Sequence, residues 1–227
     1  MRRGWPLHWA LWGWFLCVSG AGSAFGQDPG AASAAPVEPG GLANAVAPAP
    51  APAATVKVVL HTALGDIVLA LESEHAPITT ANFLRYVDQK RLDGSGFYRA
   101  MKVGDEGQYG LIQGGLQGNP RRVFKPIAHE PTSVTGLSHV DGAISMARAE
   151  PGTATADFFI VVGDLVSLDA QPDGGDPGYA VFGHVVAGMD VVRAILEQPR
   201  SPDAGEGVMK GQMIASPVKI ISARRAD

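Results

Sequence analysis

The 227-residue sequence contains a single cysteine, Cys17, and all four of its tryptophans lie within the first 14 residues. Beyond residue 26 there is no thiol, which excludes disulfide bonds and cysteine chemistry there. Basic residues are also scarce: 18 Lys and Arg stand against 22 Asp and Glu, and 16 against 22 without Arg2 and Arg3. The chain has no basic stripe, and its histidines show no metal-ligand spacing. Composition therefore argues against a nucleic-acid partner and against a metal site.

The first 26 residues have the organisation of an export signal. Arg2 and Arg3 precede an apolar stretch from Leu7 to Val18, and small residues fill Ser19 to Gly26. We expect a signal peptide over 1–26 and an exported, periplasmic protein without stable membrane association once the leader is cleaved. The alternative is a membrane anchor formed by the uncleaved leader, because the apolar stretch and the small residues together approach the length of about 20 residues that a span needs.

Residues 27–54 are rich in Ala, Pro and Gly, with two acidic residues and no aromatic residue. Such a segment cannot bury enough apolar surface to offset the entropy lost on ordering. It is therefore predicted to be a disordered Ala/Pro-rich linker. The remaining domain, residues 55–225, is long enough for one hydrophobic core and too short for two ordinary domains.

Short apolar or alternating segments separated by glycines predict strands in this domain. The predicted strands span 56–61, 67–71, 96–100, 111–113, 143–147, 158–162, 179–186 and 218–222. Two helices are predicted, one starting at Pro77 and one over residues 190–198, which Pro199 ends. Many short strands with only two helices favour a mainly β fold in the form of a closed antiparallel barrel.

Three of the predicted strands carry an unusual combination of side chains. Arg99 offers a permanently charged, planar fork of donors, and Gln113 adds an amide donor and acceptor. Phe159, the second of two consecutive phenylalanines, supplies an apolar surface that excludes water. A site of this make-up can hold an apolar group while it polarises a neighbouring amide, and it has no obvious nucleophile.

Five short motifs occur in a fixed order along the domain. They are Phe97-Tyr98-Arg99, Gln113-Gly114-Gly115, Ser145-Met146-Ala147, Phe158-Phe159-Ile160 and Val181-Phe182-Gly183. In type and order they resemble the cyclophilins, a family of peptidyl-prolyl cis-trans isomerases, in its bacterial exported form. The resemblance covers Thr55 to Ser222. It implies a closed eight-stranded antiparallel β-barrel capped by two α-helices, and the predicted strand count agrees with it.

By this resemblance, Arg99 and Gln113 are the catalytic residues. Substrate-binding positions carried over in the same way are Leu111, Met146, Ala147, Arg148, Asp157, Phe159, Leu168 and Tyr179. The implied activity is rotation about X-Pro bonds in unfolded or extended exported polypeptides. It requires no cofactor and no metal, its partners are proline-containing polypeptide substrates, and we expect a monomer.

The sequence departs from the family pattern at several places, two of which bear directly on turnover. An insertion falls within residues 102–110, and Asp157 stands where many members have Gln. Asp157 could pair with Arg99 or Arg148, or could accept backbone donors. The alternative function is therefore a catalytically weak peptide-binding or chaperone module on the same fold. The histidines, His139 among them, are interpreted as surface or satisfied structural groups.

Overall fold

The computed structural model describes residues 54–104 and 107–226. The predicted signal peptide, and all of the predicted linker except Ala54, lie outside these residues. The elements in chain order are β1 (Thr55–Thr62), β2 (Gly65–Glu72), α1 (Pro77–Asp88), β3 (Gly96–Val103), β4 (Tyr109–Gly115), α2 (Thr132–Thr135), β5 (Ala143–Met146), β6 (Phe158–Val162), the 3₁₀ helix η1 (Val166–Leu168), β7 (Ala180–Ala187), α3 (Met189–Leu196), β8 (Arg200–Ser201), the 3₁₀ helix η2 (Gly207–Met209) and β9 (Met213–Ala226).

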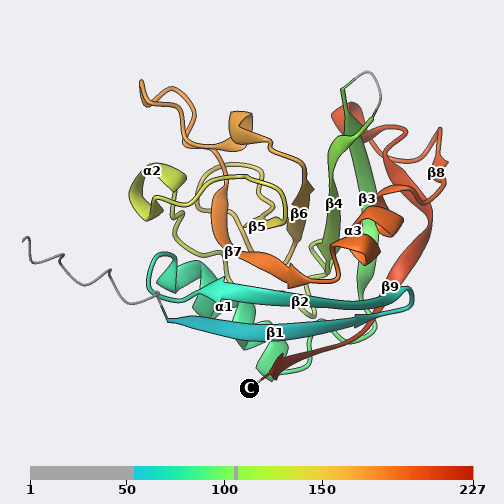
Figure 1. Ribbon diagram of the computed structural model, residues 1–227, viewed down its shortest axis with the longest axis horizontal. Helices are drawn as coiled ribbons and strands as arrows, with labels where there is room; N and C mark the ends of the chain where they lie inside the picture. The colour runs from blue at the N-terminus through green and yellow to red at the C-terminus, as the bar shows by residue number, and fades with distance from the viewer. Residues whose placement is uncertain (1–53, 105–106, 227) are drawn as a thin grey trace, which may run out of the picture. The chain divides into compact units, whose positions relative to one another are not determined.

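Eight of the strands close into an antiparallel barrel (Figure 1). Their order is β1-β2-β7-β5-β6-β4-β3-β9, and β9 pairs back onto β1, from Thr62 opposite Ile220 to Lys57 opposite Ala226. The two-residue strand β8 pairs with the start of β9 and lies outside the ring. The predicted closed eight-stranded antiparallel barrel is confirmed.

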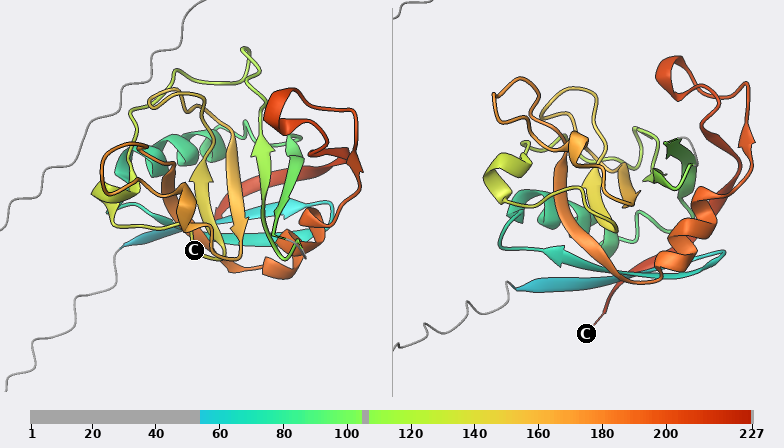
Figure 2. Two further views of the ribbon diagram at one scale, coloured as in Figure 1. Left: turned by 90° about the horizontal axis from the view of Figure 1, so that it is seen from above. Right: turned by 45° about the horizontal axis from the view of Figure 1, so that its top comes forward.

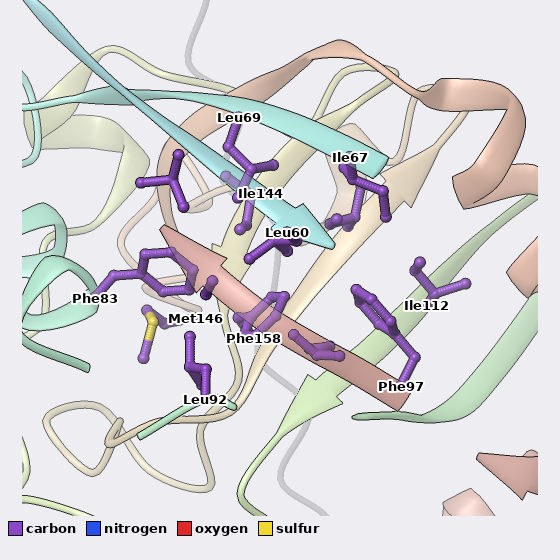
Figure 3. Close-up of a cluster of buried hydrophobic side chains, with 14 of the residues drawn as sticks. Leu60, Ile67, Leu69, Phe83, Leu92, Phe97, Ile112, Ile144, Met146 and Phe158 are labelled. Carbon is purple, nitrogen blue, oxygen red and sulfur yellow. The ribbon is translucent and has the colours of Figure 1, made fainter. Parts of the chain in front are cut away.

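Alternate side chains of the strands fill the barrel interior (Figure 3). Phe158 on β6 is fully buried and meets Phe83 of α1 and Phe97 of β3 edge to face, with ring centroids 5.3 and 5.8 Å apart. Successive residues of a strand point to opposite faces. The neighbours of these inward residues on β3, β4, β5 and β6 therefore point out of the barrel, and that outer face carries the candidate site.

Helices α1 and α3 lie on opposite sides of the barrel (Figure 2). Helix α1 begins at Pro77, as predicted, and its N-cap residue Ala76 has no side chain that can accept a hydrogen bond. The buried Glu130 supplies the missing acceptors: its carboxylate accepts the backbone N–H of Ile78 (3.0 Å) and of Thr79 (2.7 Å) and the Thr79 hydroxyl (2.6 Å). In the part of the chain that the structure describes, no helix combines the length and apolar character needed to cross a membrane.

Loss of the Glu130 carboxylate is expected to destabilise the fold. Glu130→Ala would leave two backbone N–H groups at the start of α1 without acceptors, so we expect the free energy of unfolding to fall by about 2–3 kcal/mol. Urea denaturation measures this. The exposed Glu74 near the same helix is the control, because Glu74→Ala should change stability by less than about 0.5 kcal/mol. Equal losses in the two variants would contradict the capping role.

The structure extends the sequence prediction in two places. Helix α2 was not predicted, because four residues are too few to show helical periodicity. Strand β9 begins at Met213, whereas the sequence suggested a start at 218, just after Pro217. Pro217 is tolerated because β3 pairs with Met213 and then with Val218, so the residues between them need no backbone donor toward β3.

Candidate active site

A hollow of about 650 Å³ opens on the outer face of the barrel. Strands β3, β4 and β6 contribute to its floor, the β5–β6 connection forms one flank, and η2 forms the other. Nine of the ten predicted site residues line it, namely Arg99, Leu111, Gln113, Ala147, Arg148, Asp157, Phe159, Leu168 and Tyr179. The structure thus brings residues from widely separated motifs to one surface.

The floor of the hollow rests on a second apolar cluster, distinct from the barrel interior. Leu111 of β4 and Phe159 of β6 belong to it, and both point out of the barrel because their neighbours Ile112 and Phe158 point in. Tyr179 meets Phe159 edge to face, with ring centroids 5.4 Å apart. The floor is therefore a rigid, water-poor surface that suits a compact apolar group.

Arg99, on β3, is held at the rim of this floor by two amide side chains. Its Nε and Nη2 donate to Gln212 Oε1 at 2.9 and 2.7 Å, and its Nη1 donates to Gln113 Oε1 at 2.8 Å. Nη2 also contacts the Met101 sulfur at 3.6 Å. Of the five N–H groups of a guanidinium, these contacts leave one on Nη1 for a ligand. Burial lowers the pKa of Arg99 from its usual value, but that value lies so far above neutrality that the group stays charged.

A chain of hydrogen bonds continues from Gln113 to Asp157. The Gln113 amide donates to the Tyr98 hydroxyl at 2.8 Å, and that hydroxyl donates to Asp157 Oδ1 at 3.2 Å. Burial raises the pKa of Tyr98, and the negative charge of Asp157 raises it further, so the phenol keeps the proton it donates. The Asp157 carboxylate also accepts the backbone N–H of Gln117 (2.8 Å) and Gly118 (3.2 Å). Of the roles considered for Asp157, the structure shows acceptance of backbone donors, together with the phenol of Tyr98.

The two glycines of the Gln-Gly-Gly motif are explained by close packing. A Cβ at Gly114 would come within 2.9 Å of the Phe97 ring. Gly115 has φ +132, and a Cβ there would come within 2.5 Å of Asp157 Oδ1. Only glycine lets β4 pass between the core ring and the carboxylate, and this passage places Gln113 beside Arg99.

Arg148 and Tyr179 form a stacked pair at another part of the wall. The Arg148 guanidinium lies 4.8 Å from the centre of the Tyr179 ring and donates to the Gly178 carbonyl through Nε at 3.1 Å. It also lies 3.5 Å from the carboxylate of Asp176. Arg148 therefore packs against the Tyr179 ring and stabilises its position, and its charge is already compensated by Asp176.

His139 supports the floor from behind. It is fully buried, its ring stacks on Phe159 with a centroid distance of 5.8 Å and an interplanar angle of 11°, and its Nε2 lies 3.0 Å from the Ser145 hydroxyl. Its Nδ1 contacts the carboxylate of Asp169, so Nδ1 carries the proton and Nε2 accepts from Ser145. His139 is thus a satisfied structural group, one of the two interpretations that the sequence allowed. Burial lowers its pKa, although Asp169 acts in the opposite direction.

We expect stability to depend on the neutral state of His139. The pKa of His139 in the folded state is below the ordinary value of about 6.5. Above that pH the imidazole is neutral in both states, and its contribution to the free energy of unfolding is complete. As the pH falls, the unfolded state takes up a proton before the folded state does, and this contribution is lost. The slope from one such group is at most about 1.4 kcal/mol per pH unit.

Urea titrations between pH 7.5 and 5.5 measure this slope, and NMR of the imidazole reports the pKa of His139 directly. His139→Gln should flatten the slope. An imidazole that gains its proton above pH 6.5 would contradict the prediction.

The structure corrects the placement of Met146. This residue was predicted to line the binding groove, but it is 1% exposed and lies among the core side chains near Phe83 and Leu92 (Figure 3). The physical reason is that side chains alternate along β5. Met146 points into the barrel, whereas Ser145 before it and Ala147 after it point to the side of the sheet that carries the hollow. Ala147 lines the hollow as predicted, and Met146 does not.

Several residues of the site were not predicted. Tyr98 belongs to a motif that was recognised, and its place beside Arg99 was the available signal. Gln212, Val208 and Met209 lie about a hundred residues further along the chain, and no pattern there indicates that the fold returns them to Arg99. Met101 was also missed, although the two-residue period places it on the same face as Arg99.

The arrangement can bind an apolar group against Leu111 and Phe159 while Arg99 and Gln113 hydrogen-bond to the peptide backbone beside it. A positive group held beside an amide nitrogen in a water-poor site favours the twisted form, in which the nitrogen lone pair is no longer shared with the carbonyl. Such a site needs no covalent step to change the geometry of a bound chain.

Comparisons with known proteins agree with this chemistry. The family model "Cyclophilin type peptidyl-prolyl cis-trans isomerase/CLD" matches residues 57–225. A peptidyl-prolyl cis-trans isomerase of Acinetobacter baylyi is 36% identical over 174 residues, which cover 75% of this chain and 86% of that protein. Peptidyl-prolyl cis-trans isomerase A of Dickeya dadantii is 34% identical over 184 residues, covering 78% and 91%.

Solved structures show the same fold at lower identity. A cyclophilin type isomerase of Cryptosporidium parvum superposes with a TM-score of 0.61 at 20% identity, over 77% of this chain and 99% of that one. The same protein, crystallised in the presence of the dipeptide Ala-Pro, gives a TM-score of 0.60 at 21% identity, over 75% of this chain and 99% of that one. The family model and the sequence relatives together show that this chain belongs to the cyclophilin-type peptidyl-prolyl cis-trans isomerases.

Proposed function

We propose that this protein is an exported isomerase that accelerates rotation about X-Pro bonds in unfolded or extended polypeptides after their translocation. The observation that carries the proposal is the position of Arg99: a charged guanidinium, clamped by Gln113 and Gln212, at the edge of an apolar hollow. Crystallisation of the Cryptosporidium protein in the presence of the dipeptide Ala-Pro supports a proline-containing ligand for the hollow.

In the proposed mechanism, the proline ring rests on the floor formed by Leu111 and Phe159, with Leu168 and Tyr179 at its edge. Arg99 donates to the prolyl carbonyl, which brings the guanidinium charge close to the imide nitrogen, where it stabilises the lone pair once rotation has taken it out of conjugation; Gln113 holds the peptide backbone. Amide resonance sets a barrier of about 18–20 kcal/mol. A charged hydrogen bond contributes about 1.5–3 kcal/mol, and the rest of the acceleration comes from a hollow that fits the twisted state better than either planar one.

The competing hypothesis is a catalytically weak peptide-binding or chaperone module on the same fold. The structure favours catalysis, because Asp157 is engaged by Tyr98 and by backbone groups and does not neutralise Arg99. Exchange NMR on a short Ala-Pro peptide distinguishes the two. Accelerated cis-trans exchange at substoichiometric protein supports the isomerase, whereas shifted peptide resonances without faster exchange support the module.

Export is the second part of the proposal and is supported by the basic residues, apolar stretch and small residues of the leader. Mass spectrometry of the protein recovered from a cell-envelope fraction tests it. A mature N-terminus near Gln27 supports cleavage and release into the periplasm, and an intact N-terminus in the membrane fraction supports the anchored alternative. An intact protein found in the cytosol would overturn export.

We further propose that the isomerase acts as a monomer, because Arg99, Gln113 and the apolar floor already form one continuous site on a single chain. Light scattering coupled to gel filtration should give the mass of a single chain. An activity that rises more steeply than protein concentration would contradict this.

A further inference from the structure

The flank of the hollow beside Arg99 is apolar and comes from a segment that no motif of the family indicates. Val208 and Met209 of η2 line the hollow together with Met101 of β3. Val208 is 87% exposed and Met209 is 37% exposed. We call these three side chains the apolar rim. An exposed methyl-bearing surface continuous with a binding site has affinity for an apolar group of the ligand.

The apolar rim is fixed to the guanidinium by one amide. The Oε1 atom of Gln212 accepts two hydrogen bonds from Arg99, one from Nε and one from Nη2. The Nε2 atom of Gln212 donates to the Val208 carbonyl at 2.8 Å. The backbone of Gln212 also accepts a hydrogen bond from Ala100 N–H at 2.9 Å, which attaches the segment to β3. Arg99 and the turn that carries Val208 are therefore held as one unit.

The direction of a bound chain follows from the chemistry of the prolyl carbonyl. That carbonyl belongs to the bond that joins proline to the next residue. Suppose that the proline ring lies on Leu111 and Phe159 and that its carbonyl accepts a hydrogen bond from Arg99. The chain then runs from the floor toward Arg99, and the residue after proline lies beyond Arg99, on the side opposite the floor. Strand β9, which follows η2, is the neighbour of β3 on that side, whereas β4 and β6 lie on the other. The residue after proline therefore passes over the apolar rim.

We propose that the apolar rim is a subsite for an apolar side chain on the residue directly after proline, and that Gln212 is a positioning residue that couples this subsite to Arg99. The inference rests on the proposed isomerase function and names a preference within its substrates. The other flank offers only the single methyl groups of Ala147 and Ala149 beside Thr153, Thr155 and the partnered Arg148, so the residues before proline have a smaller apolar contact there.

Exchange NMR on the peptides Ala-Ala-Pro-Leu-Ala, Ala-Ala-Pro-Ala-Ala and Ala-Ala-Pro-Glu-Ala tests the subsite. We expect the full-length protein to show a kcat/KM about five- to tenfold higher for the leucine peptide than for the alanine peptide, with the glutamate peptide no better than alanine. The double variant Val208→Ser/Met209→Ser should reduce the leucine-to-alanine ratio to less than about twofold. The control Ile221→Ser, at an exposed apolar residue of β9 away from the hollow, should keep the wild-type ratio.

The positioning role of Gln212 has its own readout. Gln212→Ala should lower kcat for both peptides, because Arg99 loses two of its anchors, and should also reduce the leucine-to-alanine ratio. A residue that only stabilised the fold would lower the melting temperature without changing the ratio. An unchanged ratio in Gln212→Ala would remove the coupling.

The outcomes separate this inference from the proposed function. If none of the peptides exchanges faster with the protein, the isomerase function itself fails. If all are accelerated but the leucine and alanine peptides are processed equally, or if the double variant keeps the wild-type ratio, the isomerase stands and the subsite is refuted. The wild-type ratio decides the question even if a variant does not fold.

Discussion

Arg99→Ala is expected to lower kcat/KM for an Ala-Pro peptide by about 10- to 100-fold, since it removes one charged hydrogen bond of about 1.5–3 kcal/mol from the transition state. The fold should survive, because the Arg99 side chain points out of the barrel into the hollow and its neighbour Ala100 faces the core. Exchange NMR gives the rate, and thermal denaturation reports whether the variant is folded.

Two further arginine variants make this result specific. Arg99→Lys keeps the charge but loses the planar guanidinium that donates to Gln113 and Gln212 at the same time. The activity of this variant should therefore stay well below that of the wild type. Arg193→Ala removes an exposed arginine of α3 that pairs with Asp141, and should leave the rate unchanged. Wild-type kcat/KM in Arg99→Ala would exclude the guanidinium from the mechanism.

Phe158→Ala is expected to have the largest effect on stability, with a loss of about 3–5 kcal/mol. The ring is fully buried, it contacts Phe83 and Phe97 edge to face, and its removal leaves a cavity in the middle of the barrel. Such a loss is a large part of the roughly 5–15 kcal/mol that stabilises a typical domain. Urea denaturation measures it.

The next residue along the strand is the matched control. Phe159→Ala also removes a buried ring, but this ring belongs to the floor of the hollow. Under conditions where both variants are folded, Phe158→Ala should keep its kcat/KM, whereas Phe159→Ala should lose about tenfold or more. The reverse pattern would show that the inward and outward faces of β6 had been exchanged.

The sequence predicted the barrel and most of the hollow because both depend on short local patterns. Glycines, alternating apolar residues and Pro77 determine where elements begin and end. The motifs around Arg99, Gln113 and Phe159 sit on adjacent strands, so the fold brings them together in the order that their resemblance implies. The residues are placed as predicted, while their roles stay predictions that the variants above test.

What the sequence did not predict depends on long-range packing. Met146 was expected to line the groove together with Ala147 and Arg148, although strand periodicity places Met146 and Ala147 on opposite faces. Gln212 is 113 residues from Arg99 and carries no local signal, yet it provides two of the hydrogen bonds that fix the guanidinium. The link from Tyr98 to Asp157 likewise spans 59 residues. Contacts of this kind follow from the path of the whole chain.

The pairing of β9 with β1 has a consequence for biosynthesis. These are the last and the first strands of the barrel, so the ring cannot close until residues 213–226 have left the ribosome. Pairing between ends so far apart in sequence is among the slowest steps of folding, because a long loop must be closed first. A nascent chain with this topology stays open until β9 has emerged, and an open chain can be threaded through a narrow secretion channel.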